Sequence, residues 1–115
     1  MTRPLTLALL AGLATGCPLL SGELPDSKRD YAGRWEGENM HLHIAPSGEI
    51  DYERRRGKST VTVTGPITKF EGDDFIVGFW FFETRFAVTA PPHLEGEVWW
   101  MTVDGVTLSR PARDP

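Results

Sequence analysis

Two histidines one residue apart, His41 and His43, are the residues of this chain whose type and spacing best fit metal chemistry. On a β-strand, side chains two positions apart share a face, so both imidazoles are expected to point the same way. A turn at Pro46-Ser47-Gly48 predicts a hairpin that brings Asp51 beside His43 and Glu53 beside His41. Two imidazoles and two carboxylates on one face could bind Zn²⁺ or another divalent cation.

The same pattern has a second interpretation. Apolar residues such as Leu42 and Ile44 alternate with the polar ones, and this alternation alone predicts a solvated outer face with ordinary pairs of histidine and carboxylate. His93 follows two prolines and would complete a metal site only if its loop folded back. The sequence favours the solvated face, so we expect no cofactor and keep the metal site as an alternative.

Catalytic motifs give no support for an enzyme. The chain has no Gly-x-Ser-x-Gly elbow and no phosphate-binding glycine loop, and its three histidines have no nucleophile partner in sequence. The carboxylates are scattered over predicted strands and turns, so they suggest no acid–base pair. We therefore assign no catalytic residues and expect a protein that is not an enzyme.

The N-terminus has the layout of a secretory signal peptide over residues 1–16. Arg3 precedes an apolar run from Leu5 to Leu13, and small residues lead to the single cysteine, Cys17. The stretch Leu13-Ala14-Thr15-Gly16-Cys17 resembles the lipobox of bacterial lipoproteins, with Ala14 where that family prefers leucine. This resemblance implies that Cys17 becomes the lipidated first residue after cleavage.

Two alternatives to lipidation remain open at this point, an uncleaved transmembrane anchor and a secreted protein with an incidental cysteine. The apolar run is shorter than the roughly 20 residues that span a bilayer, which favours the lipoprotein. Pro18, rather than aspartate, follows Cys17, and the sorting rule of that family then implies the outer membrane, facing the periplasm. Several acyl chains would attach such a protein stably. Residues 17–30 are accordingly predicted to be the lipidated cysteine and a flexible tether.

The segment Phe75–Val88 is the predicted core, because it holds five of the six phenylalanines within fourteen residues. Its aromatic and β-branched side chains favour a sheet, and its length requires a bend between Gly78 and Glu83. If Phe75, Val77, Phe79 and Phe81 face the core, the alternation leaves Trp80 and Phe82 exposed. Trp100 is a third candidate for an exposed aromatic that binds a partner or ligand, because the C-terminal hairpin places it on the face away from the core.

That hairpin has an Asp104-Gly105 turn, which predicts pairing of Val103 with Val106 and of Met101 with Leu108. Earlier in the chain, a turn at Arg56-Gly57 predicts that Tyr52 faces Val61. Gly65-Pro66 is expected to interrupt a strand, and Pro91-Pro92 to begin a loop that lasts to Gly96.

Together these signals predict an all-β domain over residues 31–110, an antiparallel meander of about seven or eight short strands that closes into a small barrel or sandwich. Residues 111–115 are expected to form a disordered tail. The opening Gly33-Arg34-Trp35 resembles the Gly-x-Trp of lipocalin-like barrels, in which the tryptophan closes one end of the barrel. That resemblance implies a core position for Trp35 and raises the alternative of a carrier for a small apolar or lipid ligand.

The net charge of −4 argues against nucleic acid as a partner, since a nucleic-acid footprint needs a basic face. Arg54, Arg55, Arg56 and Lys58 form a local basic cluster, interpreted either as a contact for an anionic partner or as a solvated turn. The favoured function is a lipid-anchored interaction module of the bacterial envelope that binds a protein or cell-wall partner through exposed aromatics or its polar face. The carrier and the metal site are the alternatives.

Overall fold

The computed structural model of the chain describes residues 23–79 and 81–112. A 3₁₀-helix, η3 (Asp26–Tyr31), precedes nine antiparallel strands that belong to one sheet. The strands are β1 (Gly33–Gly37), β2 (Met40–Ile44), β3 (Glu49–Arg56), β4 (Ser59–Glu71), β5 (Asp74–Phe79), β6 (Phe82–Phe86), β7 (Val88–Glu95), β8 (Val98–Val103) and β9 (Val106–Pro111).

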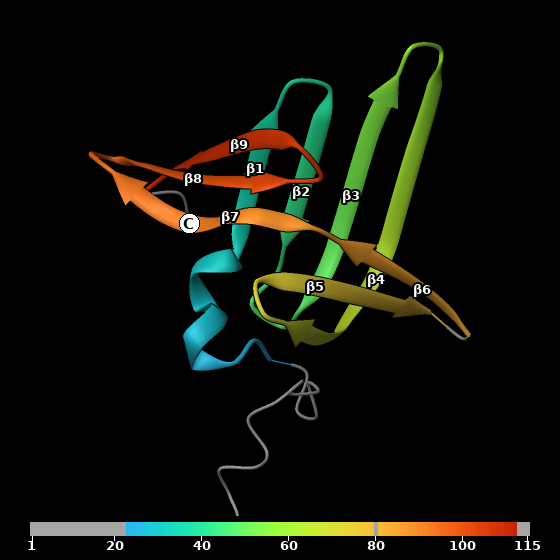
Figure 1. Ribbon diagram of the computed structural model, residues 1–115, viewed down its shortest axis with the longest axis horizontal. Helices are drawn as coiled ribbons and strands as arrows, with labels where there is room; N and C mark the ends of the chain where they lie inside the picture. The colour runs from blue at the N-terminus through green and yellow to red at the C-terminus, as the bar shows by residue number, and fades with distance from the viewer. Residues whose placement is uncertain (1–22, 80, 113–115) are drawn as a thin grey trace, which may run out of the picture.

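The sheet has the strand order β6-β5-β4-β3-β2-β1-β9-β8-β7 and curls into a half-barrel (Figure 1). Within the described residues, each paired strand is a neighbour in sequence except β1 and β9, which are joined where Glu36 lies opposite Ser109. The prediction of an all-β antiparallel meander is confirmed. The described strands number nine instead of seven or eight, because the chain bends at Ala87 between β6 and β7 and continues as a strand through the segment expected to be a loop.

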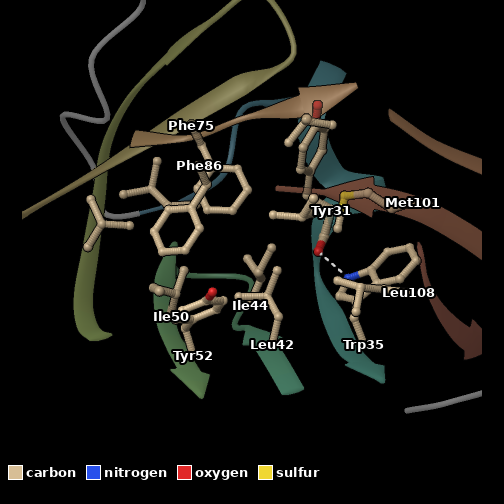
Figure 2. Packing of buried hydrophobic residues seen from close by; sticks show 14 of the residues in the cluster. Tyr31, Trp35, Leu42, Ile44, Ile50, Tyr52, Phe75, Phe86, Met101 and Leu108 are labelled. Carbon is tan, nitrogen blue, oxygen red and sulfur yellow. Dashed lines mark hydrogen bonds between the residues drawn. The ribbon is translucent and has the colours of Figure 1, made fainter. Parts of the chain in front are cut away.

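The core fills the concave side of the sheet (Figure 2). Trp35 is fully buried, and its Nε1 donates a hydrogen bond of 2.9 Å to the backbone oxygen of Tyr31. Phe75 and Phe86 stack with ring centroids 4.9 Å apart, and Tyr52 meets Phe86 edge-on at the same separation. Such aromatic pairs add about 0.5–1.5 kcal/mol to the energy of burial. The aromatic segment is thus the centre of the core, as its composition predicts.

The expected bend between Gly78 and Glu83 is confirmed, since Gly78 pairs with Glu83 across the β5–β6 hairpin. The assignment of Phe81 to the core is wrong: its side chain is 80% exposed. The reason is that Phe81 lies in the connection between β5 and β6 and not on a strand, so the alternation used to assign it has already ended.

The predicted register of the β2–β3 hairpin is confirmed, with Ile44 opposite Ile50 and His43 opposite Asp51. The predicted register of β3 with β4 is wrong by two residues, because Tyr52 faces Val63 instead of Val61. A slip of two residues keeps every side chain on its face, so hydrophobic alternation cannot detect it.

Strand β4 continues through Gly65-Pro66, contrary to the predicted interruption. Pro66 lies opposite Glu49 near the start of β3, and the register with β5 shifts between Ile67 and Lys69. Pro66 comes before Ile67, the first residue of β4 that pairs with β5, so its missing N–H costs no bond to that strand. In the same way, Pro91 and Pro92 lie inside β7, where the register with β8 shifts between Ala90 and His93, so the expected loop to Gly96 is a strand.

The folded unit begins before Tyr31. Leu24 is 6% exposed and belongs to the core cluster, and its N–H donates to the oxygen of Pro46 at 3.0 Å. Lys28 Nζ donates to Gly72 O at 2.8 Å, so η3 is fixed to the β4–β5 turn. The segment 24–30 is therefore not a free spacer, although its composition predicts one.

At the other end, Pro111 completes β9 and the N–H of Ala112 donates to Glu97 O at 3.0 Å, so the predicted tail begins later than residue 111. The predicted signal peptide and Cys17 lie outside the described residues. Within 23–79 and 81–112, none of the helical structure is long and apolar enough to cross a membrane.

Candidate functional site

The outer face of strands β1 to β4 carries two rows of polar side chains across the sheet. In the first row, Arg34 lies opposite His43, which lies opposite Asp51, which lies opposite Thr64. The second row, two residues along each strand, consists of Glu36, His41, Glu53 and Thr62. We call these eight residues the polar face. On β1, β2 and β3 each member stands next to a buried residue, so the core fixes its direction. On β4, Thr62 stands between Val61 and Val63, which are not fully buried, and Thr64 precedes the buried Gly65.

The polar face is hollowed, and the hollow has a volume of about 420 Å³. Both rows line it. His41 Nδ1 pairs with Glu36 Oε1, and both side chains are more than half exposed. Cations, carboxylates, imidazoles and hydroxyls thus share one open surface, where they can exchange hydrogen bonds with a polar partner.

The predicted pairings of His43 with Asp51 and of His41 with Glu53 are present in the register. Cross-strand neighbours of this kind lie close enough to interact. Among the residues that the structure describes, however, no three side chains of His, Cys, Asp or Glu are grouped so as to hold a metal ion. His41 instead pairs with Glu36, and His93 pairs with Glu95 at 3.1 Å on β7. The geometry thus gives no support for the alternative of a metal site.

The candidate aromatics do not gather at one place. Phe82 is 67% exposed at the start of β6, and its ring centroid lies 5.0 Å from that of Phe81. Trp100 is half-buried on β8, opposite Ser109 and His93. β6 leads into β7, which continues in the same general direction (Figure 1), so the start of β6 and the end of β7 lie far apart. Phe82 belongs to the first of these ends and His93 to the second. Trp80 lies outside the described residues.

Trp100 instead extends the second row of the polar face. Ser109 on β9 lies opposite Glu36 on one side and Trp100 on the other. An aromatic side chain therefore stands two strands from the carboxylate of Glu36, on the same outward side. Aromatic side chains supply contact area at little entropic cost, which suits a binding surface.

Sequence reasoning missed Arg34 and Glu36. The signal was present, since Glu38-Asn39 forms the two-residue turn that pairs β1 with β2, and Asn39 has φ of 60°. Asparagine tolerates the left-handed region better than most residues, so it marks such a turn. Recognising the turn would have placed β1 beside β2 and its two charged residues on the polar face.

A second missed residue is Arg110, which is 9% exposed at the edge of the core. Its guanidinium carbon lies 4.9 Å from the Trp35 ring and 5.1 Å from the Trp99 ring, and its Nη2 donates to Asp30 O at 3.1 Å. A cation between two indole rings gains about 1–2 kcal/mol where it is desolvated. Arg110 therefore joins η3, β1 and β8 at one end of the half-barrel.

Comparisons with protein-family models, with curated proteins and with solved structures found no match to this chain.

Proposed function

We propose that this protein is a lipid-anchored binding module of the bacterial envelope, attached through Cys17, and that it binds a polar partner through the polar face and Trp100. The observation that carries the binding role is the hollowed outer surface, on which charged and hydroxyl side chains from four strands stand in register. The lipid attachment rests on the resemblance of residues 13–17 to a lipobox.

The interior weighs against a carrier of small ligands. A carrier needs a cavity among the inward side chains, but here Trp35, Phe75 and Phe86 are among the fully buried side chains, and they pack with Tyr52 and Met101 at the centre (Figure 2). Eight-stranded barrels that hold a ligand leave this space open. The Gly-x-Trp sequence that starts at Gly33 supports the proposal of a lipocalin-like fold, but it does not support a bound ligand.

The position of the N-terminal segment supports a particular orientation. Because Leu24 is packed in the core, a tether from Cys17 has only residues 18–23 and reaches about 25 Å at full extension. The end with η3 is then held close to the membrane, and the β3–β4 turn, with exposed Arg55, Arg56 and Lys58, lies at the opposite end (Figure 1). In this orientation the basic turn points away from the membrane of attachment, and the polar face runs between the two ends.

The proposal is tested by site-specific photocrosslinking in bacterial cells that express the full chain. A photoreactive residue at Thr62, on the polar face, should yield a reproducible adduct with an envelope component. The control carries the photoreactive residue at Ser47 instead, which is exposed in the β2–β3 turn. Adding Glu53→Lys should reduce the Thr62 adduct about tenfold, which corresponds to about 1.4 kcal/mol for reversing a charge in a binding surface.

Mass spectrometry of the same preparation tests the anchor. The expected N-terminal peptide begins at Cys17 with acyl chains, and Cys17→Ser should release the protein from the membrane fraction. Equal crosslinking at Thr62 and Ser47 would refute the binding face, whereas an unmodified Cys17 would refute the anchor alone.

A further inference from the structure

Strand β6 forms one end of the sheet, and in the described part of the chain no strand pairs with its outer edge. Its residues Phe82 to Arg85 are all exposed, and only Phe86 is buried. The register Gly78 opposite Glu83 fixes which backbone groups face outward. In an antiparallel hairpin with a two-residue connection, bonded and non-bonded positions alternate from the turn, so the N–H and C=O groups of Glu83 and Arg85 point to the open edge.

The two ends of the sheet differ in how they are protected. β7, at the other end, contains Pro91 and Pro92 and two register shifts against β8. Prolines and irregularities of this kind block the addition of a further strand. β6 has five regular pairs with β5 and contains no proline or lysine. The unprotected edge also begins with the exposed ring of Phe82.

The sequence of β6 is complementary to itself when two copies run antiparallel. A two-fold axis at Thr84 places Glu83 of each copy opposite Arg85 of the other, and both residues have outward-facing backbone groups. Arg85 is held on this face by Glu71 and by Asp74, the latter at 3.0 Å, so its charge is already positioned. The same register places Phe82 of each copy opposite Phe86, at the end of the other β6, so the second copy covers part of the exposed Phe82 ring.

We propose that β6 is a self-association edge, through which two copies of this chain join their half-barrels into one continuous antiparallel sheet centred on Thr84. Main-chain hydrogen bonds supply the affinity, and the two Glu83–Arg85 contacts fix the register. A symmetric pair of this kind uses the edge of both copies, so it forms a dimer and cannot extend into a larger assembly. This inference does not depend on the partner of the polar face.

A single cysteine at the symmetry axis tests the register in the full chain. Opposed residues at a non-bonded antiparallel position have Cα atoms about 4.5 Å apart, within the range that a disulfide spans. In an oxidising envelope, Thr84→Cys should give a disulfide-linked dimer on non-reducing gels. Thr107→Cys, also exposed but on β9 and outside the polar face, should give at least tenfold less. The wild-type chain, whose single cysteine is Cys17, is the control for disulfides formed through Cys17. A disulfide-linked dimer of the wild type would indicate that lipidation has failed, and it would not count against the β6 edge.

Charge reversal separates this pairing from random collision. In the Thr84→Cys background, Glu83→Arg should reduce the amount of dimer about tenfold, because an arginine then faces an arginine at both contacts between the copies. Arg85→Glu should do the same, and co-expression of the two variants should restore a mixed dimer, since both contacts regain opposite charges. Glu83→Pro removes an outward N–H and should abolish the dimer even if Arg85→Glu fails to fold. Equal amounts of dimer from Thr84→Cys and Thr107→Cys, or no mixed dimer from two folded variants, would overturn the proposal.

Discussion

The contact between Gly33 and Arg110 gives a physical reason for the Gly-x-Trp opening. Gly33 has φ of 138°, in the region that favours glycine, and a Cβ added there would lie 2.5 Å from Arg110 Cδ. The absence of a side chain lets Arg110 lie across β1 and reach the ring of Trp35. The glycine and the tryptophan of the motif are therefore coupled through a third residue at the other end of the chain.

Gly33→Ala should lower the free energy of unfolding by about 3 kcal/mol, from backbone strain and from displacement of Arg110. Gly57→Ala is the matched control, because Gly57 also has positive φ, at 58°, but an added Cβ meets nothing within 4 Å. It should cost about 1 kcal/mol. Urea unfolding measures both, and equal losses would refute the role of the Arg110 contact.

Tyr31 should make the free energy of unfolding depend on pH in the alkaline range. Its side chain is 3% exposed and its hydroxyl donates to Asp73 O at 2.8 Å; burial first, and then the charges of Asp73 and Asp74, raise the pKa of Tyr31 far above its usual value. A raised pKa in the folded state means that the contribution of Tyr31 is complete below the unfolded pKa near 10 and falls as the pH rises above it.

The variant Tyr31→Phe isolates this dependence. At pH 8 the wild type should be more stable by about 1 kcal/mol, the value of the hydrogen bond. Above pH 10 this advantage should shrink by about 1.4 kcal/mol for each pH unit and then reverse. Urea unfolding of both proteins from pH 8 to 11 measures the difference. A difference that stayed constant over this range would show that Tyr31 does not ionise on unfolding as expected.

At the scale of elements, local turn chemistry predicted hairpins well. The Asp104-Gly105 turn fixed Val103 opposite Val106 and Met101 opposite Leu108, and the three-residue turn fixed β2 against β3. Both turns have short connections whose backbone requirements only a few residues meet. Four residues of the polar face, His41, His43, Asp51 and Glu53, follow from the β2–β3 register, and the structure pairs them as predicted.

The failures at this scale have a common physical origin. The β3–β4 turn consists of Gly57 and Lys58, with arginines before it and Ser59 and Thr60 after it. All of these side chains are polar, so hydrophobic alternation does not determine where the turn lies. Pro66 in β4 lies just before the pairing with β5 begins, and Pro91 and Pro92 in β7 lie where the register with β8 shifts. Only the neighbouring strands reveal these positions. The junction at Ala87 depends on Asp104, whose Oδ1 accepts the Ala87 N–H at 2.9 Å from a distant turn. Contacts of this kind have no local signature.

At the scale of the whole molecule, the segment before the sheet is part of the folded unit. Leu24→Ala should lower the free energy of unfolding by about 2 kcal/mol, the lower range for a buried leucine, because Leu24 lies at the border of the core. Leu94→Ala is the control, since Leu94 is 50% exposed and should change stability by less than about 0.5 kcal/mol. Trypsin should also cut faster after Arg29 in Leu24→Ala. Equal stability of the two variants would mean that the domain starts at β1 after all.

Among the described strands, β1 and β9 are the one pair whose members lie far apart in the sequence, and this has a consequence for the order of folding. The remaining strand pairs are hairpins that close only short loops, so each can form independently of the rest of the chain. The β1–β9 seam must bring together Glu36 and Ser109 from near the two ends of the described chain, and it therefore bears most of the entropy of loop closure. Until that seam forms, the molecule is two separate sheets, β1 to β6 and β7 to β9, with Trp35 on one and Arg110 on the other.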